Sequence, residues 1–171
     1  LNASEVVRLA DYDRDGDLDF LITAGGGSPN LLYRNDGDGS FTDVAQQAGV
    51  AIVDTHSTGA VACDVDNDGY QDLYVGAWGY PGDGLDFRSP NEGNLDHLFL
   101  NMRDGTFRDI TASAFGDAVN PRSATSVVCA DVDGEISVGN LRGHDFGDLW
   151  FGGRMTEYRL IHIAGRFEEI P

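Results

Sequence analysis

The chain has 171 residues, about the length of one domain. Its formal net charge is −18, because 29 Asp and Glu residues outnumber 11 Lys and Arg residues. This acidity argues against nucleic acid and against an anionic membrane surface as partners, since both are bound through Lys and Arg. The apolar share of 41% argues against disorder, and 23 glycines among many aromatic residues favour an all-β chain with many turns.

Four short strands and one helical turn are predicted in the first fifty residues. The first two strands flank an Asp-rich turn. The last two flank a run of Asn, Asp and Gly at 35–39, residue types that tolerate positive φ and favour a hairpin. In chain order, the predicted elements are strands Glu5–Ala10, Leu18–Ala24, Leu31–Arg34 and Phe41–Val44, followed by the helical turn Ala45–Gly49.

The same unit recurs along the chain. The Asp-rich segment that begins at Asp11 returns 53 residues later at Asp64, with the same spacing. A third, degraded copy opens at Asp131 and carries an insertion at Gly134–His144. We therefore expect a single domain over residues 1–171, built of repeat one at about 1–49, repeat two at about 50–116 and repeat three at about 117–171.

The pattern Asp-x-Asp-x-Asp-Gly-x-x-Asp predicts a metal loop in each of the first two repeats. Alternate carboxylates in a tight turn can face one centre, and the residue after the Gly can add its backbone carbonyl. The expected ligands of the first loop are Asp11, Asp13, Asp15, Asp19 and the carbonyl of Asp17. Those of the second loop are Asp64, Asp66, Asp68, Asp72 and the carbonyl of Tyr70.

Calcium is the expected ion, because the ligands are all oxygen atoms and magnesium demands tighter octahedral geometry. An EF-hand is excluded, since its twelfth position is Glu and here that position is Ile22 or Val75. Solvated turns are the alternative, but two loops with equal spacing and equal flanks are hard to explain without a cation. In the third repeat, Asp131, Asp133 and Asp148 are the candidate ligands, and the spacing leaves a third calcium site open.

The units resemble FG-GAP/VCBS repeats, which form the propeller blades of integrin α-chain heads and of many secreted bacterial proteins. The resemblance rests on the two Asp loops, on the strands that leave them, and on the tails Gly39–Val44 and Gly105–Ile110. It implies a β-propeller-type fold with calcium in the blade loops, and an extracellular or cell-surface location. It implies no particular activity.

Three blades of four strands are too few to close a propeller ring, which usually has 4–8 blades. An open array would expose apolar blade faces, and exposed apolar faces mark interfaces. We therefore expect the partner to be other blades of a longer chain or other copies of this one, with filaments as the outcome of contacts that do not close.

No catalytic motif occurs among the residues, and we expect a non-enzymatic module for adhesion or assembly. The four histidines lack zinc spacing, and His97 is expected as a packed residue of a strand. Two alternatives remain, a carbohydrate-binding module and the propeller of a polysaccharide-degrading enzyme. Trp78 and Tyr80 could stack on a glycan, although packing within a blade is the commoner role of such aromatics.

The two cysteines, Cys63 and Cys129, allow one disulfide bond or two small buried apolar residues. The sequence does not decide between these. No apolar run approaches the ~18–20 residues of a membrane helix, so we expect no membrane insertion.

Overall fold

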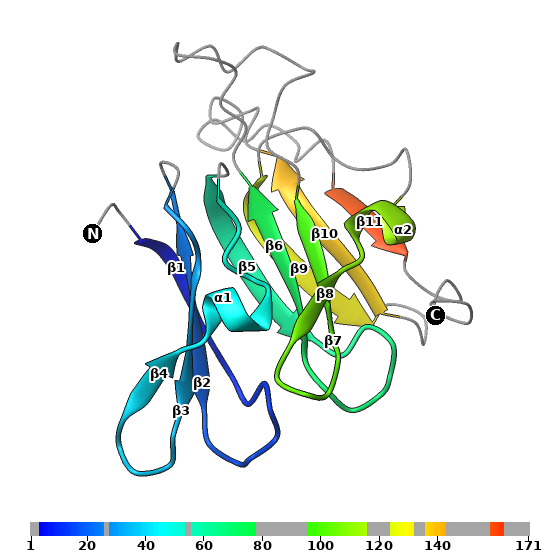
Figure 1. Ribbon diagram of the computed structural model, residues 1–171. Coiled ribbons are helices and arrows are strands. Elements are labelled where there is room, and N and C mark those ends of the chain that lie inside the picture. The colour runs from blue at the N-terminus through cyan, green and yellow to red at the C-terminus, as the bar shows by residue number, and fades with distance from the viewer. Residues whose placement is uncertain are drawn as a thin grey trace.

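A computed structural model of the chain shows three antiparallel sheets, arranged one after another along the chain (Figure 1). The structure describes residues 4–25, 28–53, 56–77, 96–115, 124–131, 136–142 and 158–162. Two of the sheets have four strands in the order of the chain, and the third has three, so the all-β expectation is confirmed.

Each four-stranded sheet is a meander that is followed by one short helix. Sheet 1 consists of β1 (Ser4–Ala10), β2 (Asp19–Ala24), β3 (Leu31–Asn35) and β4 (Phe41–Asp43), and α1 (Ala45–Ala48) follows it. Sheet 2 consists of β5 (Ser57–Cys63), β6 (Asp72–Ala77), β7 (His97–Asn101) and β8 (Phe107–Asp109), and α2 (Thr111–Phe115) follows it. Sheet 3 consists of β9 (Ala124–Asp131), β10 (Ile136–Arg142) and β11 (Tyr158–His162), in the order β11-β10-β9.

The strands predicted for the first repeat are confirmed to within about a residue. The helical turn after β4 is confirmed too, and it ends at Gly49, whose φ of 82° lets its N–H reach carbonyls of the preceding turn. None of the helices in the described ranges is long and apolar enough to cross a membrane.

One apolar core lies between sheet 1 and sheet 2. The inner face of sheet 1 supplies Leu21 and Leu32, and all four strands of sheet 2 supply residues from the facing side. The helix α1 closes this core with Ala45 and Ala48. The members of the core from sheet 2 are Ala60, Leu73, Val75, Phe99 and Phe107.

A second core lies on the opposite face of sheet 2, toward sheet 3. Tyr74, Leu98 and Leu100 point to this face, and Val127 of β9 packs against them. A disulfide bond joins Cys63 of β5 to Cys129 of β9, with 6.5 Å between the two Cα atoms. The question that the sequence left open is thus answered in favour of the bond.

The outer face of sheet 1 has no covering layer in the described part of the chain. Val7 and Leu9 of β1 are 54% and 63% exposed, and Phe41 of β4 is 44% exposed. Between them, the ring of Phe20 lies 5.0 Å from that of Tyr33 and 4.9 Å from that of Phe41. Sheet 2 buries its corresponding face against sheet 1, so the two sheets differ in what covers them.

The third repeat departs from the predicted layout. The insertion expected at Gly134–His144 is largely a strand, because β10 occupies Ile136–Arg142 and pairs with β9 from Ile136 opposite Asp131. A whole strand therefore separates Asp131 from Asp148 along the chain. The Gly-, Pro-, Asp- and Asn-rich composition of residues 79–94 predicts a long loop, and this stretch lies outside the described residues.

We predict that Phe107→Ala lowers the free energy of unfolding by about 3–5 kcal/mol, because the ring is buried between sheets 1 and 2 and packs edge-on to Tyr12 at 6.0 Å. Phe41→Ala is the matched control, since Phe41 holds the corresponding place in sheet 1 but is 44% exposed. Urea unfolding of both variants measures the difference. Equal losses would contradict the assignment of the buried and exposed faces.

Candidate metal centre

The two Asp-rich loops have the same backbone shape. Arg14 and Asn67, the fourth residues of the loops, both have positive φ, at 61° and 58°. Gly16 and Gly69 follow two residues later with φ of 98° and 90°, a conformation that other residues adopt only with strain. The equal spacing of the sequence thus produces equal turns.

The carboxylates of each loop accept hydrogen bonds from the loop's own backbone, position by position. In the first loop, the Gly16 N–H donates to Asp11 over 3.1 Å and the Asp17 N–H donates to Asp15 over 2.9 Å. The second loop repeats these bonds, from Gly69 to Asp64 over 2.7 Å and from Tyr70 to Asp68 over 2.7 Å. These bonds hold the side chains inside the turn.

The last Asp of each loop fastens the loop to the third strand of its sheet. Asp19 accepts the N–H of Tyr12 over 3.0 Å and the N–H of Asn35 over 2.8 Å. Asp72 does the same with Val65 and Asn101, each over 2.8 Å. The two carboxylates are almost fully buried, so their first role is to pair backbone groups of two different segments.

Three carboxylates converge in each loop. In the first loop, Asp11, Asp13 and Asp15 can each place an oxygen within 4.8 Å of the other two. In the second loop, the group consists of Asp64, Asp66 and Asp72. Each group omits one of the four predicted Asp side chains. The first loop omits Asp19, the last Asp of its motif, and the second omits Asp68, the third Asp of its motif.

The donor set fits a hard divalent cation. All the converging atoms are carboxylate oxygens, which calcium accepts six to eight at a time together with carbonyls and water. One buried oxygen of Asp11, Oδ1, has no hydrogen-bond partner among the described residues, and a buried acceptor without a partner is costly. A cation in the first loop would satisfy this atom and offset the repulsion among the three charges.

Burial raises the pKa of three loop carboxyls. The pKa of Asp72 rises from 3.8 to about 7, mainly because burial disfavours its charge and partly because Asp66 and Asp68 lie nearby. The hydrogen bonds from Asn101 and Val65 lower it in part. Burial is also the main cause of the raised pKa values of Asp19 and Asp66.

The remaining predicted site residues are less fully placed. The N–H groups of Asp17 and Tyr70 bond to loop carboxylates, and the role of their carbonyls stays a prediction. Asp131 is the last residue of β9. Asp133, Asp148, Trp78 and Tyr80 lie outside the described residues.

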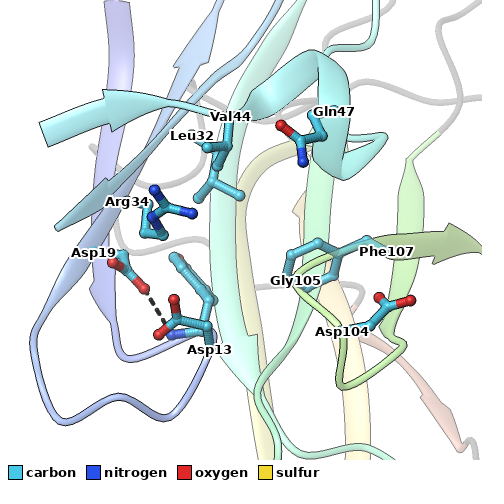
Figure 2. Close-up of a pocket in the computed structure, with 10 residues that line it drawn as sticks. Asp13, Asp19, Leu32, Arg34, Val44, Gln47, Asp104, Gly105 and Phe107 are labelled. Atoms are coloured by element: carbon cyan, nitrogen blue, oxygen red, sulfur yellow. Dashed lines mark hydrogen bonds between the residues drawn. The ribbon is translucent and has the colours of Figure 1, made fainter. Parts of the chain in front are cut away.

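A pocket of about 180 Å³ lies beside the first loop, where sheet 1 meets the β7–β8 hairpin (Figure 2). Figure 2 shows Asp13 and Asp19 on one side of it, and Asp104 with Phe107 on the other. Three of its lining residues are acidic, so the first loop opens onto an acidic space between two sheets. The full lining is Tyr12, Asp13, Asp19, Leu32, Arg34, Val44, Gln47, Asp104, Gly105 and Phe107.

Sequence reasoning missed the role of two asparagines. Asn35 and Asn101 end the third strands, and each offers its N–H to the last Asp of its loop. Their side-chain amides also donate to loop carbonyls, from Asn35 to Leu18 and from Asn101 to Gln71 and Tyr12. The recurrence of an Asn at the same place in both tails was the available signal.

Residues 8–75 match the family model described as FG-GAP-like repeat, and this stretch includes both Asp loops. The predicted resemblance is thereby confirmed: the chain carries FG-GAP-like repeat sequence. Among curated proteins it is similar to cartilage acidic protein 1 from Xenopus tropicalis, Homo sapiens and Mus musculus, at 33%, 32% and 31% identity over 110 residues. The matched region is 63% of this chain and 14% of each relative, so the chain spans only a small part of their length.

We predict that the metal-free protein becomes less stable as the pH rises from about 4 to 7. Asp72 has a higher pKa in the folded chain than in the unfolded chain, so the folded state binds more protons in this range and loses relative stability as they leave. Thermal unfolding in chelator at several pH values measures the slope. Asp72→Asn should flatten it, and an equal slope in both proteins would contradict the assignment.

Proposed function

We propose that this chain is a calcium-binding repeat module of an extracellular protein, without enzymatic activity, that acts in adhesion or assembly. One observation carries the proposal. Two loops in successive repeats share their backbone shape and their internal hydrogen bonds, and each loop brings three carboxylates together.

In this proposal calcium makes the loops rigid. The first loop would hold it through Asp11, Asp13 and Asp15, and the second through Asp64, Asp66 and Asp72. A cation that binds only the folded loop stabilises it by RT ln(1 + [L]/Kd), about 2.7 kcal/mol per site at a hundredfold excess over Kd. The chain's own contribution is to aim the carboxylates and to bond each loop to the third strand.

We also propose that each sheet is one blade of a propeller-type array. Sheets 1 and 2 are four-stranded meanders that stack face to face through an apolar core, and sheet 2 packs again on sheet 3 (Figure 1). Repeated antiparallel sheets that pack through their faces are typical of propeller blades.

The proposed partner is a further repeat of the same kind, packed on the outer face of sheet 1. Val7, Leu9, Phe20, Tyr33 and Phe41 make this face apolar. The corresponding face of sheet 2 packs against sheet 1, and this packing supports a sheet of the same kind as the proposed partner. The extra repeat belongs either to a longer chain or to a second copy, and a second copy would allow head-to-tail filaments.

Two observations support an extracellular location. Disulfide bonds persist mainly in oxidising compartments, and Cys63 is bonded to Cys129. The curated relatives carry names that place them in cartilage, although the chain covers only 14% of their length.

Calcium is expected to raise the unfolding midpoint of the chain well above its value in chelator, and magnesium to raise it little. Differential scanning calorimetry in the three conditions measures this. Asp13→Asn should remove a large part of the calcium-dependent rise, because it takes one carboxylate from the first group.

Asp17→Asn is the matched control, since Asp17 lies in the same loop but its side chain is not in the carboxylate group. It should leave the calcium-dependent rise nearly intact. The proposal fails if calcium and chelator give the same midpoint in the parent protein.

We expect the 171-residue chain to self-associate at micromolar concentration through the outer face of sheet 1. Leu9→Asp should return it to a monomer, because it places a charge in the middle of the apolar face at a side chain that is 63% exposed. Sedimentation velocity measures the association. A folded parent protein that stays monomeric would count against this interface.

A further inference from the structure

The two metal loops differ at their fifth position. In the first loop, the carboxylate of Asp15 converges with those of Asp11 and Asp13. In the second loop, the corresponding Asp68 is absent from the converging group and forms an ion pair with Arg103, whose Nε donates to its Oδ2 over 2.6 Å.

The arginine comes from the hairpin that joins β7 to β8. The corresponding residue of the β3–β4 hairpin is Gly37, and both residues have positive φ, 65° for Arg103 and 75° for Gly37. Both N–H groups donate to the Asn that ends the preceding strand, Asn101 over 2.9 Å and Asn35 over 3.1 Å. The two hairpins thus have the same shape, and only one of them carries a side chain at its tip toward the metal loop.

Asp68 is held on both of its oxygens. Oδ1 accepts the N–H of Tyr70 over 2.7 Å, and Oδ2 accepts Arg103, which leaves only 8% of the side chain exposed. The guanidinium of Arg103 also lies 6.0 Å from the centre of the Tyr70 ring, and that of Arg14 lies 5.0 Å from it. Two positive charges of the chain therefore lie beside Tyr70 of the second loop, one from Arg103 and one from Arg14 of the first loop.

We propose that Arg103 is an internal cation that occupies Asp68 and makes the second metal site weaker than the first. The inference rests on the proposed calcium binding. A cation that recruits Asp68 must compete with the guanidinium for that carboxylate, and one that does not recruit it binds to Asp64, Asp66 and Asp72 with a positive charge close by. Among the described residues no guanidinium pairs with Asp15 of the first loop, since the corresponding hairpin residue is Gly37 and the nearby Arg34 pairs with Asp36. Calcium should fill the first loop before the second.

Isothermal titration of the whole chain with calcium chloride tests this proposal. The test is made in an Asp13→Asn background, in which the first loop lacks one of its three carboxylates. In this background Arg103→Gly should raise the calcium affinity of the second loop by roughly five- to tenfold, which corresponds to the free energy of one partly buried ion pair. Glycine suits the positive φ of this position, so the variant retains the turn. The same variant should unfold at a lower temperature in chelator, because Asp68 loses its partner.

Arg103→Lys is the matched control, since it retains the positive charge and should retain the weak affinity. Asp68→Asn provides a second check: in that background Arg103→Gly should no longer raise the affinity by the same factor. Calcium binding that is unchanged by Arg103→Gly would overturn this inference and leave the proposed function standing. The absence of calcium binding in every variant and in the parent would overturn both.

Discussion

The hydrogen bonds accepted by the last Asp of each loop are the constraint on which the repeat depends. Asp19 and Asp72 each take one N–H from the start of their loop and one from the end of the third strand. A single buried carboxylate thereby joins the Asp-rich turn, the second strand that it begins and the neighbouring hairpin. The loop carboxylates converge because this anchor fixes both ends of the turn. The cost is a buried negative charge, which appears as the raised pKa of both residues.

Sheets 1 and 2 depend on their neighbours because each has two apolar faces. Sheet 2 is covered on both, by sheet 1 through Leu73 and Phe99 and by the side of sheet 3 through Tyr74 and Leu98. A four-stranded meander with two apolar faces cannot be satisfied by a single neighbour. Repeats of this kind therefore stack one after another, because each added sheet covers the apolar face of its neighbour and exposes an apolar face of its own.

Much of this could be predicted from the sequence, because the information was local and repeated. Spacing alone placed the Asp loops, and the run of Asn, Asp and Gly at 35–39 placed the first hairpin. What escaped prediction depends on contacts between distant segments. Arg103 and Asp68 are 35 positions apart in the chain, and no local pattern relates them. The strand β10 was mistaken for an insertion because the Asp motif of the third repeat is degraded, and strand pairing with β9 rather than the motif defines it.

The disulfide bond has a mechanical consequence. It joins two residues 66 positions apart, and the enclosed segment contains the second Asp loop and the strands β6 to β8. If tension is applied at the ends of the chain, force passes across the Cys63–Cys129 bond and bypasses this segment. About 220 Å of contour length is thereby withheld from stretching, at ~3.3–3.6 Å per residue. The first Asp loop lies outside the bond, so it bears the load, while the second is shielded for as long as the bond is intact.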